Sequence, residues 1–419
     1  MKTNRVEKYR IKQSDKKFYD VIDKICFDSK NLYNSANYII RQKFIETSKE
    51  KESGIREHAV YIGRYEMCGI CKDIDQYKSM DASSAQQTLR ILDQNWKSFF
   101  AAIKDWRKHP DNYLGRPKIP KYLPKDGRFI YVVNNQRFKI KDGYIYFTQK
   151  VLKPLNNYFK THILQNAKLI QVMFVPLKND YNVELVYQID IEESNSNSEK
   201  IASIDMGIDN VICMVTNIKE LQPVVINGKG VKSQNQYYNK EISKIRSEAK
   251  IRHNQNWTKE MGRFTDKRNR KQEDFWHKTS RWIVDYCVQN NIDTVVCGKN
   301  KNWKQKSDMG KKNNQKFVDI AHATGIFKIS YKCQDAGIKF IETEESYTSG
   351  TSFIDGEMPE KDFYDKSRRV YRGLFKADTG EYINADVNGA YQIMKKVFPN
   401  AFVDGVDGYM RHPVIVNIE

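Results

Sequence analysis

The sequence predicts a multidomain protein of the α+β class, with an N-terminal β-barrel-like domain that carries a helical insertion and a C-terminal α/β domain. Three observations lead to this fold class. A chain of 419 residues is long for a single hydrophobic core. Short strands with alternating apolar residues follow one another between residues 128 and 191. After residue 200, apolar strands alternate with helical patterns, as in α/β domains.

The first part of the chain begins as a strand and then becomes helical. Residues 1–12 alternate as a strand does, and residues 17–47 and 58–72 follow a helical pattern. The clearest helix is expected from Ala85 to Trp106, where apolar residues recur at steps of three and four and form one stripe. That stripe predicts a helix packed in a small bundle.

Residues 109–127, "HPDNYLGRPKIPKYLPKDG", interrupt the regular structure because prolines and glycines recur throughout. The segment is basic and carries tyrosines, so it is either a contact for a phosphate backbone or a plain linker between domains. The candidates for a phosphate contact here are Lys118, Lys121, Lys125 and Arg128.

The strands after residue 128 indicate a small barrel or a curled sheet, with a hairpin turn at Asp142-Gly143. If residues 1–12 join that sheet, the helices become an insertion in a β domain. We therefore expect a β-barrel-like (wedge) domain of residues 1–12 and 111–195, and a helical recognition insertion of residues 13–110. The polar stretch 192–200 is typical of a linker, and the α/β domain is expected at 196–419.

The charge of the chain points to a polyanionic partner. Lys+Arg exceed Asp+Glu by 71 to 52, a formal net charge of +19. This excess favours nucleic acid over an anionic membrane surface, because it is spread along the chain. Residues 229–281 alone hold 15 Lys/Arg and 6 Asp/Glu, and aromatic residues are interleaved among them. The nucleic-acid-binding candidates here and in the lysine-rich stretch 298–317 are Lys244, Arg252, Arg263, Arg268, Arg270, Trp303 and Lys304.

The seven cysteines are scattered and show no disulfide framework, which predicts a cytoplasmic protein in a reducing compartment. No apolar run is long enough for a membrane span, so no membrane partner is expected. The one Cys-x-x-Cys pair, Cys68 and Cys71, lies in a helical stretch and has no second pair nearby. Plain packing is the favoured interpretation of this pair, with zinc binding as the alternative.

Three acidic residues occupy similar settings in the α/β domain. Asp205 ends the strand "IASID", Glu342 lies in the strand "GIKFIETEE", and Asp386 stands where "INADVNGAYQIM" turns into a helix. If these elements are neighbours, three carboxylates converge and repel one another unless a cation is present. Mg²⁺ prefers such oxygen ligands, and two such ions can hydrolyse a phosphodiester. Asp209, after the turn at Gly207, is interpreted as a turn residue.

The three motifs "IDMGIDNVICMVT", "IETEESYTSGTSF" and "NADVNGAYQIM" resemble, in order, the split pieces of a RuvC-like nuclease domain. Flanking segments such as "SSAQQTLRILDQNWKSFFAAIK" and "FWHKTSRWIVDYC" extend the resemblance over nearly the whole chain. The sequence most resembles the TnpB family of RNA-guided nucleases encoded by bacterial transposons, to which compact type V CRISPR effectors are related. The resemblance implies that the α/β domain is RNase H-like (RuvC).

The resemblance also implies the site and its partners. Asp205, Glu342 and Asp386 would be the catalytic carboxylates and would hold two Mg²⁺ ions, with Glu344 or Glu345 replacing Glu342 if the register differs. The partners would be a guide RNA and double-stranded target DNA read beside a short target-adjacent motif. Many family members bind zinc between the second and third motifs. Here residues 350–383 contain no cysteine, so no zinc is expected and this lobe would be zinc-free.

Two further residues keep open interpretations. Asn388 fits the family pattern and would either form a hydrogen bond near the site or cap the following helix. His277 is expected to be a structural or phosphate contact, with a catalytic role as the alternative. The predicted activity is RNA-guided DNA cleavage. Its alternatives are a compact type V CRISPR effector, a nuclease-dead RNA-guided repressor, a strand-transfer transposase and a RuvC-like nuclease without a guide.

Overall fold

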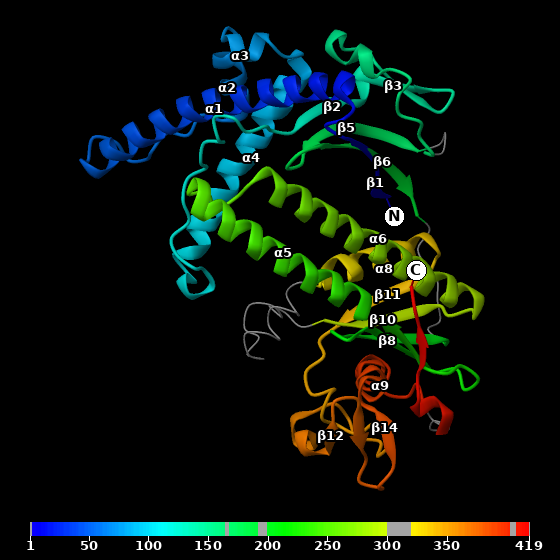
Figure 1. Cartoon of the computed structure of the whole chain (residues 1–419). Helices are drawn as coiled ribbons and strands as arrows, with labels where there is room; N and C mark the ends of the chain where they lie inside the picture. The colour runs from blue at the N-terminus through cyan, green and yellow to red at the C-terminus, as the bar shows by residue number, and fades with distance from the viewer. Residues whose placement is uncertain (1, 164–166, 192–198, 300–319, 403–407, 419) are drawn as a thin grey trace. The chain divides into compact units, whose positions relative to one another are not determined.

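The computed structural model describes residues 2–163, 167–191, 199–299, 320–402 and 408–418 (Figure 1). The chain divides into two compact units, Lys2–Asp190 and Ile191–Glu419 together with Met1. Both contain helices and sheets, so the protein is a mixed α+β chain of more than one unit. The two units are described separately.

The first unit contains an open antiparallel sheet in the order β1-β6-β5-β2. Its strands are β1 (Lys2–Ile11), β2 (Tyr131–Asn134), β5 (Lys168–Pro176) and β6 (Tyr181–Asp190). A separate hairpin joins β3 (Phe138–Lys141) to β4 (Tyr144–Phe147), and Asp142 and Gly143 at its tip have φ of 52° and 76° as a type I′ turn requires. Among the described strands β1 and β2 remain edges, so the expected barrel is not closed and the curled-sheet alternative applies.

The helices of this unit lie in the sequence between strands of one sheet, because β1 pairs with β6 along its whole length. They are α1 (Lys16–Glu52), α2 (Arg64–Cys71), α3 (Asp75–Lys78) and α4 (Ala82–Trp106). The predicted stripe on α4 is buried against α1 at Leu89, Leu92 and Trp96. The Trp96 indole N–H donates to Asn37 Oδ1 at 3.0 Å, which satisfies the one polar atom of that buried ring.

Residues 109–127 form one short 3₁₀ turn, η1 (Pro110–Asn112), and otherwise run without regular structure along α1. Side chains of α1 hold the segment by its backbone. Asn34 exchanges two hydrogen bonds with the backbone of Leu123, at 2.8 and 3.0 Å, and Arg41 donates to the Pro120 carbonyl at 2.7 Å. The segment is therefore fixed to the helical part of the first unit.

The second unit is built on a mixed six-stranded sheet in the order β11-β10-β7-β8-β9-β15. The strands are β7 (Ile201–Met206), β8 (Asn210–Thr216), β9 (Val224–Asn227), β10 (Thr294–Gly298), β11 (Lys339–Thr343) and β15 (Val414–Val416). β7, β8 and β9 form an antiparallel meander, whereas β10 and β11 add to β7 in parallel. β9 and β15 carry weak strand signals and were not expected from the sequence.

Helices cover both faces of this sheet. One face packs beneath α6 (Lys259–Gln289) and α8 (His322–Asp335), in a core that includes Trp276, Ile283 and Ile329. The other face packs against α9 (Ala385–Val397), with Tyr391 and Met394 in its core (Figure 1). The long helix α5 (Lys229–His253) pairs with α6. A three-stranded lobe, β12 (Arg369–Tyr371), β13 (Leu374–Lys376) and β14 (Tyr382–Asn384), precedes α9.

In the part of the chain that the structure describes, no helix combines the length and the apolar character that crossing a membrane requires.

Candidate active site

Asp205 lies near the end of β7, on the face of the sheet that α9 covers. Its neighbour on that face, Ser203, donates a hydrogen bond to the Ala390 carbonyl in α9. A glycine in α9 allows the carboxylate to approach, because a Cβ at position 389 would lie 2.9 Å from Asp205 Oδ2. Protein atoms surround the carboxyl group, although the residue keeps some solvent exposure. Burial, and next the charge of Asp386, raise its pKa to about 7.

Asp386 occupies the first turn of α9, where its position is fixed by the start of the helix. The Asn384 side chain caps the helix and accepts hydrogen bonds from the backbone N–H groups of Asp386 and Val387 at 3.0 and 3.2 Å. Asn210, at the start of β8, donates its amide N–H to Asp386 Oδ2 at 2.7 Å. Asn210 thereby orients the Asp386 carboxylate, whose charge contributes to raising the pKa of Asp205.

Glu342 lies on the opposite face of the sheet from Asp205. Across the parallel strands, Cys297 pairs with Ile204 on one side and with Glu342 on the other. Paired positions point to the same face, and Ile204 and Cys297 are buried in the core beneath α6 and α8. Asp205 follows Ile204 and so points the other way. The Glu342 side chain is 43% exposed and forms an ion pair with Lys299 at 2.5 Å. The structure therefore brings Asp205 and Asp386 together without Glu342.

Glu345, rather than Glu342, lies close enough to Asp205 for their charges to interact. It follows β11 in the connection to the lobe and is half-buried. Burial, and next the charge of Asp205, raise its pKa to about 8. A Cβ at position 298 would lie 2.7 Å from Glu345 Oε2, so the absent side chain of Gly298 leaves the space that this carboxylate occupies. Glu344 is exposed and paired with Lys396 at 2.7 Å.

The carboxylates of Asp205, Glu345 and Asp386 fit a site for a divalent cation. Two of the three have a raised pKa, which means that their negative charges are costly in the protein without a compensating cation. Carboxylate oxygens are the ligands that Mg²⁺ prefers. The spaces left by Gly298 and Gly389 let the carboxylate oxygens lie close to backbone, which bulkier residues would prevent. The donor set and its surroundings thus suit Mg²⁺.

Two residues beside these carboxylates had no signal in the sequence. Asn210 orients Asp386 as described, and Arg369, the first residue of β12, places Nη2 3.7 Å from Asp386 Oδ1. The positive charge of Arg369 also favours ionised Asp205. Arg369 belongs to a strand of only three residues, which is too short for a sequence pattern to reveal. Its position beside Asp386 is known only from the three-dimensional structure. Asp209, interpreted as a turn residue, forms ion pairs with Lys232 and, at 2.9 Å, with Arg372.

Of the two roles considered for Asn388, the structure contradicts the helix cap, and the side chain instead forms hydrogen bonds two residues away from Asp386. Its Oδ1 accepts a hydrogen bond from the Phe353 backbone N–H at 2.9 Å, and its Nδ2 donates to the Thr351 carbonyl at 2.8 Å. The side chain is fully buried. The helix cap is Asn384, and Asn388 instead attaches the start of the lobe to α9.

The lobe is held by charged residues. Arg368 donates two hydrogen bonds to Glu357 at 2.7 and 2.8 Å and one to Asp378 at 2.7 Å. Asp355 accepts backbone hydrogen bonds from Asp378 and Thr379 at 2.8 and 3.2 Å. The oxygens of Asp355, Glu357 and Asp378 come within 4.8 Å of one another, and the guanidinium of Arg368 offsets part of their negative charge. This ionic cluster ties the two ends of the lobe together.

Some of the nucleic-acid-binding candidates are exposed, whereas others already form hydrogen bonds or ion pairs within the protein. Arg128 is engaged, because it forms a two-bond ion pair with Asp23 at 2.6 and 2.9 Å and stacks over Phe27. Arg268 donates to Asn235 at 2.8 Å and lies over the Tyr238 ring. Trp303 and Lys304 lie outside the described residues. The exposed candidates are Lys118, Lys121, Lys125, Lys244, Arg252, Arg263 and Arg270.

Two further residues that the sequence analysis considered, His277 and Cys71, each contact a neighbouring side chain. His277 on α6 receives a hydrogen bond from Lys328 of α8, with 2.6 Å between Lys328 Nζ and Nε2. The Cys71 thiol is buried against Met67, and burial raises its pKa to about 11. Cys71 is therefore a packing residue within the helical bundle.

Comparison with known families and proteins agrees with the sequence motifs. Residues 184–304 match the model of a family of probable transposases, OrfB_IS605, and residues 322–393 match the Cas12f1-like TNB domain. The TnpB-like protein ORF457 of Acidianus two-tailed virus is 24% identical over 405 residues, which are 88% of this chain and 81% of that protein. The chain is thus related to the TnpB family, as its motifs indicated.

A second relative is the CRISPR-associated endodeoxyribonuclease Cas12f1 of Sulfoacidibacillus thermotolerans. It is 24% identical over 239 residues, and the match spans about half of each protein, 53% of this chain and 52% of the relative. Among solved structures, a Cas12f1–sgRNA–target DNA complex aligns over 93% of this chain and 98% of that one, at 16% identity and a TM-score of 0.36. CasPhi-2 bound to crRNA aligns with a TM-score of 0.40 at 8% identity.

Proposed function

We propose that the protein is an RNA-guided DNA endonuclease of the compact type V kind. The observation that carries this proposal is that the buried Asp205 carboxylate interacts with the charge of Asp386 on one side and with that of Glu345 on the other. The relatedness to TnpB-like and Cas12f1 proteins supports RNA as the guide and DNA as the substrate. The order of an antiparallel meander followed by parallel strands supports assigning residues 196–419 to an RNase H-like (RuvC) domain.

In this proposal Asp205, Glu345 and Asp386 would hold two Mg²⁺ ions, and Glu345 replaces Glu342 as the second catalytic carboxylate. When bound, the ions supply an activated water and stabilise the leaving oxygen of the phosphodiester. Asn210 orients the Asp386 carboxylate, and Asn384 fixes the backbone of Asp386 at the start of α9. The exposed guanidinium edge of Arg369, whose side chain is 40% accessible, is placed to bind a phosphate oxygen beside the carboxylates.

The remaining parts have roles that follow from charge and position in the chain. The exposed basic residues of α5 and α6 would bind the phosphate backbone of the guide RNA or its duplex with DNA. The first unit, with its wedge sheet (1–12 and 111–195) and helical insertion (13–110), would grip the RNA and read the target-adjacent motif. The lobe of residues 350–383 would act without zinc, held by Arg368.

The deciding experiment compares two isosteric substitutions three residues apart, Glu345→Gln after β11 and Glu342→Gln on β11. The protein is purified with its flanking non-coding RNA and offered matched DNA with Mg²⁺. We expect Glu345→Gln to lower the single-turnover cleavage rate by about 10²- to 10³-fold, since several kcal/mol of charge stabilisation depend on the metal site. Glu342→Gln serves as the matched control and should cleave within a few-fold of wild type. The reverse result would restore Glu342 as the ligand.

The same assay separates the alternative functions. DNA binding without Mg²⁺-dependent cleavage by the wild-type protein would identify an RNA-guided repressor. Cleavage that persists after ribonuclease treatment would identify a nuclease, or a strand-transfer transposase, that needs no guide. Retained cleavage in Asp205→Ala would refute the site itself. The genomic neighbours, transposon ends or a CRISPR array, would decide between a transposon protein and a CRISPR effector.

A further inference from the structure

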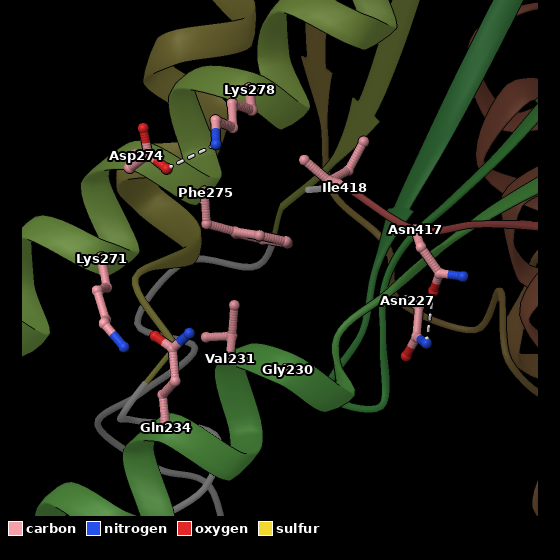
Figure 2. A pocket seen from close by; sticks show the side chains of 10 residues that line it. All are labelled: Asn227, Gly230, Val231, Gln234, Lys271, Asp274, Phe275, Lys278, Asn417 and Ile418. Atoms are coloured by element: carbon pink, nitrogen blue, oxygen red, sulfur yellow. Dashed lines mark hydrogen bonds and ion pairs between the residues drawn. The ribbon is translucent and has the colours of Figure 1, made fainter.

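A pocket of about 350 Å³ opens between the start of α5, the middle of α6 and the residues that follow β15. It is separate from the carboxylate site and contains none of its residues. Its volume falls in the range of about 300–1,000 Å³ that is usual for small-molecule sites. Figure 2 shows that its lining comes from three segments far apart in the sequence, which are Asn227–Gln234, Lys271–Lys278 and Asn417–Ile418.

Polar side chains make up most of the pocket lining, and its apolar part consists of Phe275, Val231 and Ile418. Phe275 projects from α6 into the space, with Val231 of α5 below it and Ile418 across from it in Figure 2. The Phe275 ring is only partly buried, so one part of it packs on the core and another part faces the pocket. A partly exposed ring opposite aliphatic side chains forms a slot suited to a flat ring system.

The rim of the pocket carries amide groups with unused hydrogen-bonding capacity. Asn227 donates to Asn417 Oδ1 at 2.9 Å, which leaves the Asn417 amide N–H groups for a ligand. Gln234 is half-buried, and its side-chain amide forms no hydrogen bond with any of the described residues. An amide offers a donor and an acceptor side by side, which is the pattern needed to pair with the edge of a nucleobase.

Positive charge surrounds the opening. Lys271 is exposed and forms no ion pair within the described part of the chain, and Figure 2 shows it beside Gln234. Lys278 is paired with Asp274 at 3.1 Å, so that acid contributes no net negative charge to the rim. Seven of the ten lining residues belong to the basic stretch 229–281, which has a local excess of nine positive charges from 15 Lys/Arg and 6 Asp/Glu. These features favour a ligand that joins a flat ring to a phosphate.

We propose that this pocket takes a single unstacked base of the nucleic acid that the protein binds, with its ring against Phe275, its edge at Gln234 and Asn417, and its phosphate near Lys271. The inference rests on the proposed function, since it requires a bound strand, and it adds a specific nucleotide site outside the active site. An RNA and a DNA strand offer the same base chemistry, so the experiment tests both.

The experiment scans the bound strands with abasic nucleotides, one position at a time, in the RNA and separately in each DNA strand. Stacking on an aromatic side chain contributes about 1–3 kcal/mol per base, or about fivefold to more than a hundredfold in Kd. In the wild-type protein, an abasic nucleotide at one position should weaken binding by at least about fivefold. In Phe275→Leu, which keeps an apolar side chain on the core, the same abasic position should cost less than twofold.

Two further variants make the result specific to the pocket. Gln234→Ala should reduce the same abasic penalty without touching the core. Lys271→Ala should weaken binding more than Lys267→Ala, which removes an equal charge one turn away on the same helix and outside the pocket. If the complex binds and cleaves DNA but Phe275→Leu and Gln234→Ala leave every abasic penalty unchanged, the pocket inference is refuted and the proposed function stands. If the wild-type protein binds neither RNA nor DNA, the proposed function itself fails.

Discussion

Replacing Asp205 by asparagine is expected to stabilise the metal-free protein at pH 8 and to remove its cleavage activity. The carboxyl pKa rises from 3.8 to about 7 on folding, chiefly because the group is buried. Each pKa unit corresponds to about 1.4 kcal/mol, so ionising Asp205 in the folded protein costs up to about 4 kcal/mol. Because the residue keeps some solvent exposure, we expect a gain of about 2–4 kcal/mol from the uncharged, isosteric amide.

The direction with pH follows from the same shift. Between about pH 4 and pH 7 the folded protein holds a proton on Asp205 that the unfolded chain has released. The free energy of unfolding of the wild-type protein in EDTA therefore falls as the pH rises through this range. Glu345, with its pKa raised to about 8, contributes in the same direction. In the asparagine variant, residue 205 does not titrate and no longer contributes to this fall in the free energy of unfolding. The variant should therefore exceed wild type in stability by little at pH 4 and by most at pH 8.

The assay is native-state hydrogen exchange of amides in β7 and α9, in EDTA at several pH values, which reports on the second unit alone. Asp209→Asn is the matched control, since it makes the same substitution four residues away. Asp209 forms favourable ion pairs with Lys232 and Arg372, so its neutralisation should lower stability slightly, by about 0.2–1 kcal/mol. If Asp205→Asn is less stable than wild type at pH 8 without metal, the claim that ionised Asp205 is costly in the folded protein is wrong.

Three more substitutions test the surroundings of the site. Gly298→Ala places a Cβ 2.7 Å from Glu345 Oε2 and should lower single-turnover cleavage about a hundredfold by displacing that carboxylate; unchanged cleavage would show that Glu345 has no role. Arg368→Ala leaves Glu357 without its guanidinium partner and should cost the lobe about 2–3 kcal/mol, measured as faster hydrogen exchange in the lobe alone. Asn388→Ala leaves two buried backbone groups unpaired and should lower the free energy of unfolding by about 2 kcal/mol in urea titrations, whereas a neutral effect would contradict the hydrogen bonds described.

Periodicity in the sequence was enough to predict the elements that carry most of the fold. The α4 stripe, the turn at Asp142-Gly143 and the strand that ends in Asp205 were all found from local patterns. Strands of three or four residues, such as β9 and those of the lobe, carry too few residues for a period to be recognised. The sequence also could not decide between a closed barrel and an open curled sheet. Whether two edge strands meet depends on tertiary packing rather than on the sequence of either strand.

The choice among Glu342, Glu344 and Glu345 required the pairing register of three strands. Successive residues of β11 point to opposite faces of the sheet, but the sequence alone does not say which of these faces packs against α9. The pairing of Cys297 with both Ile204 and Glu342 places Glu342 on the face opposite α9. Glu345 lies beyond the strand, where parity no longer applies. Its place depends on Gly298, a residue 47 positions earlier whose only signal is a missing side chain.

The attachment of Asn388 to the lobe has a mechanical consequence. Asp386 and Asn388 are two residues apart on α9, a helical rise of about 3 Å, and one faces the carboxylates while the other holds Thr351 and Phe353. Any force that a bound strand exerts on the lobe is delivered to the same turn of helix that positions the carboxylate of Asp386. A strand that bound the lobe would therefore be linked to the position of the Asp386 carboxylate through a single turn of α9.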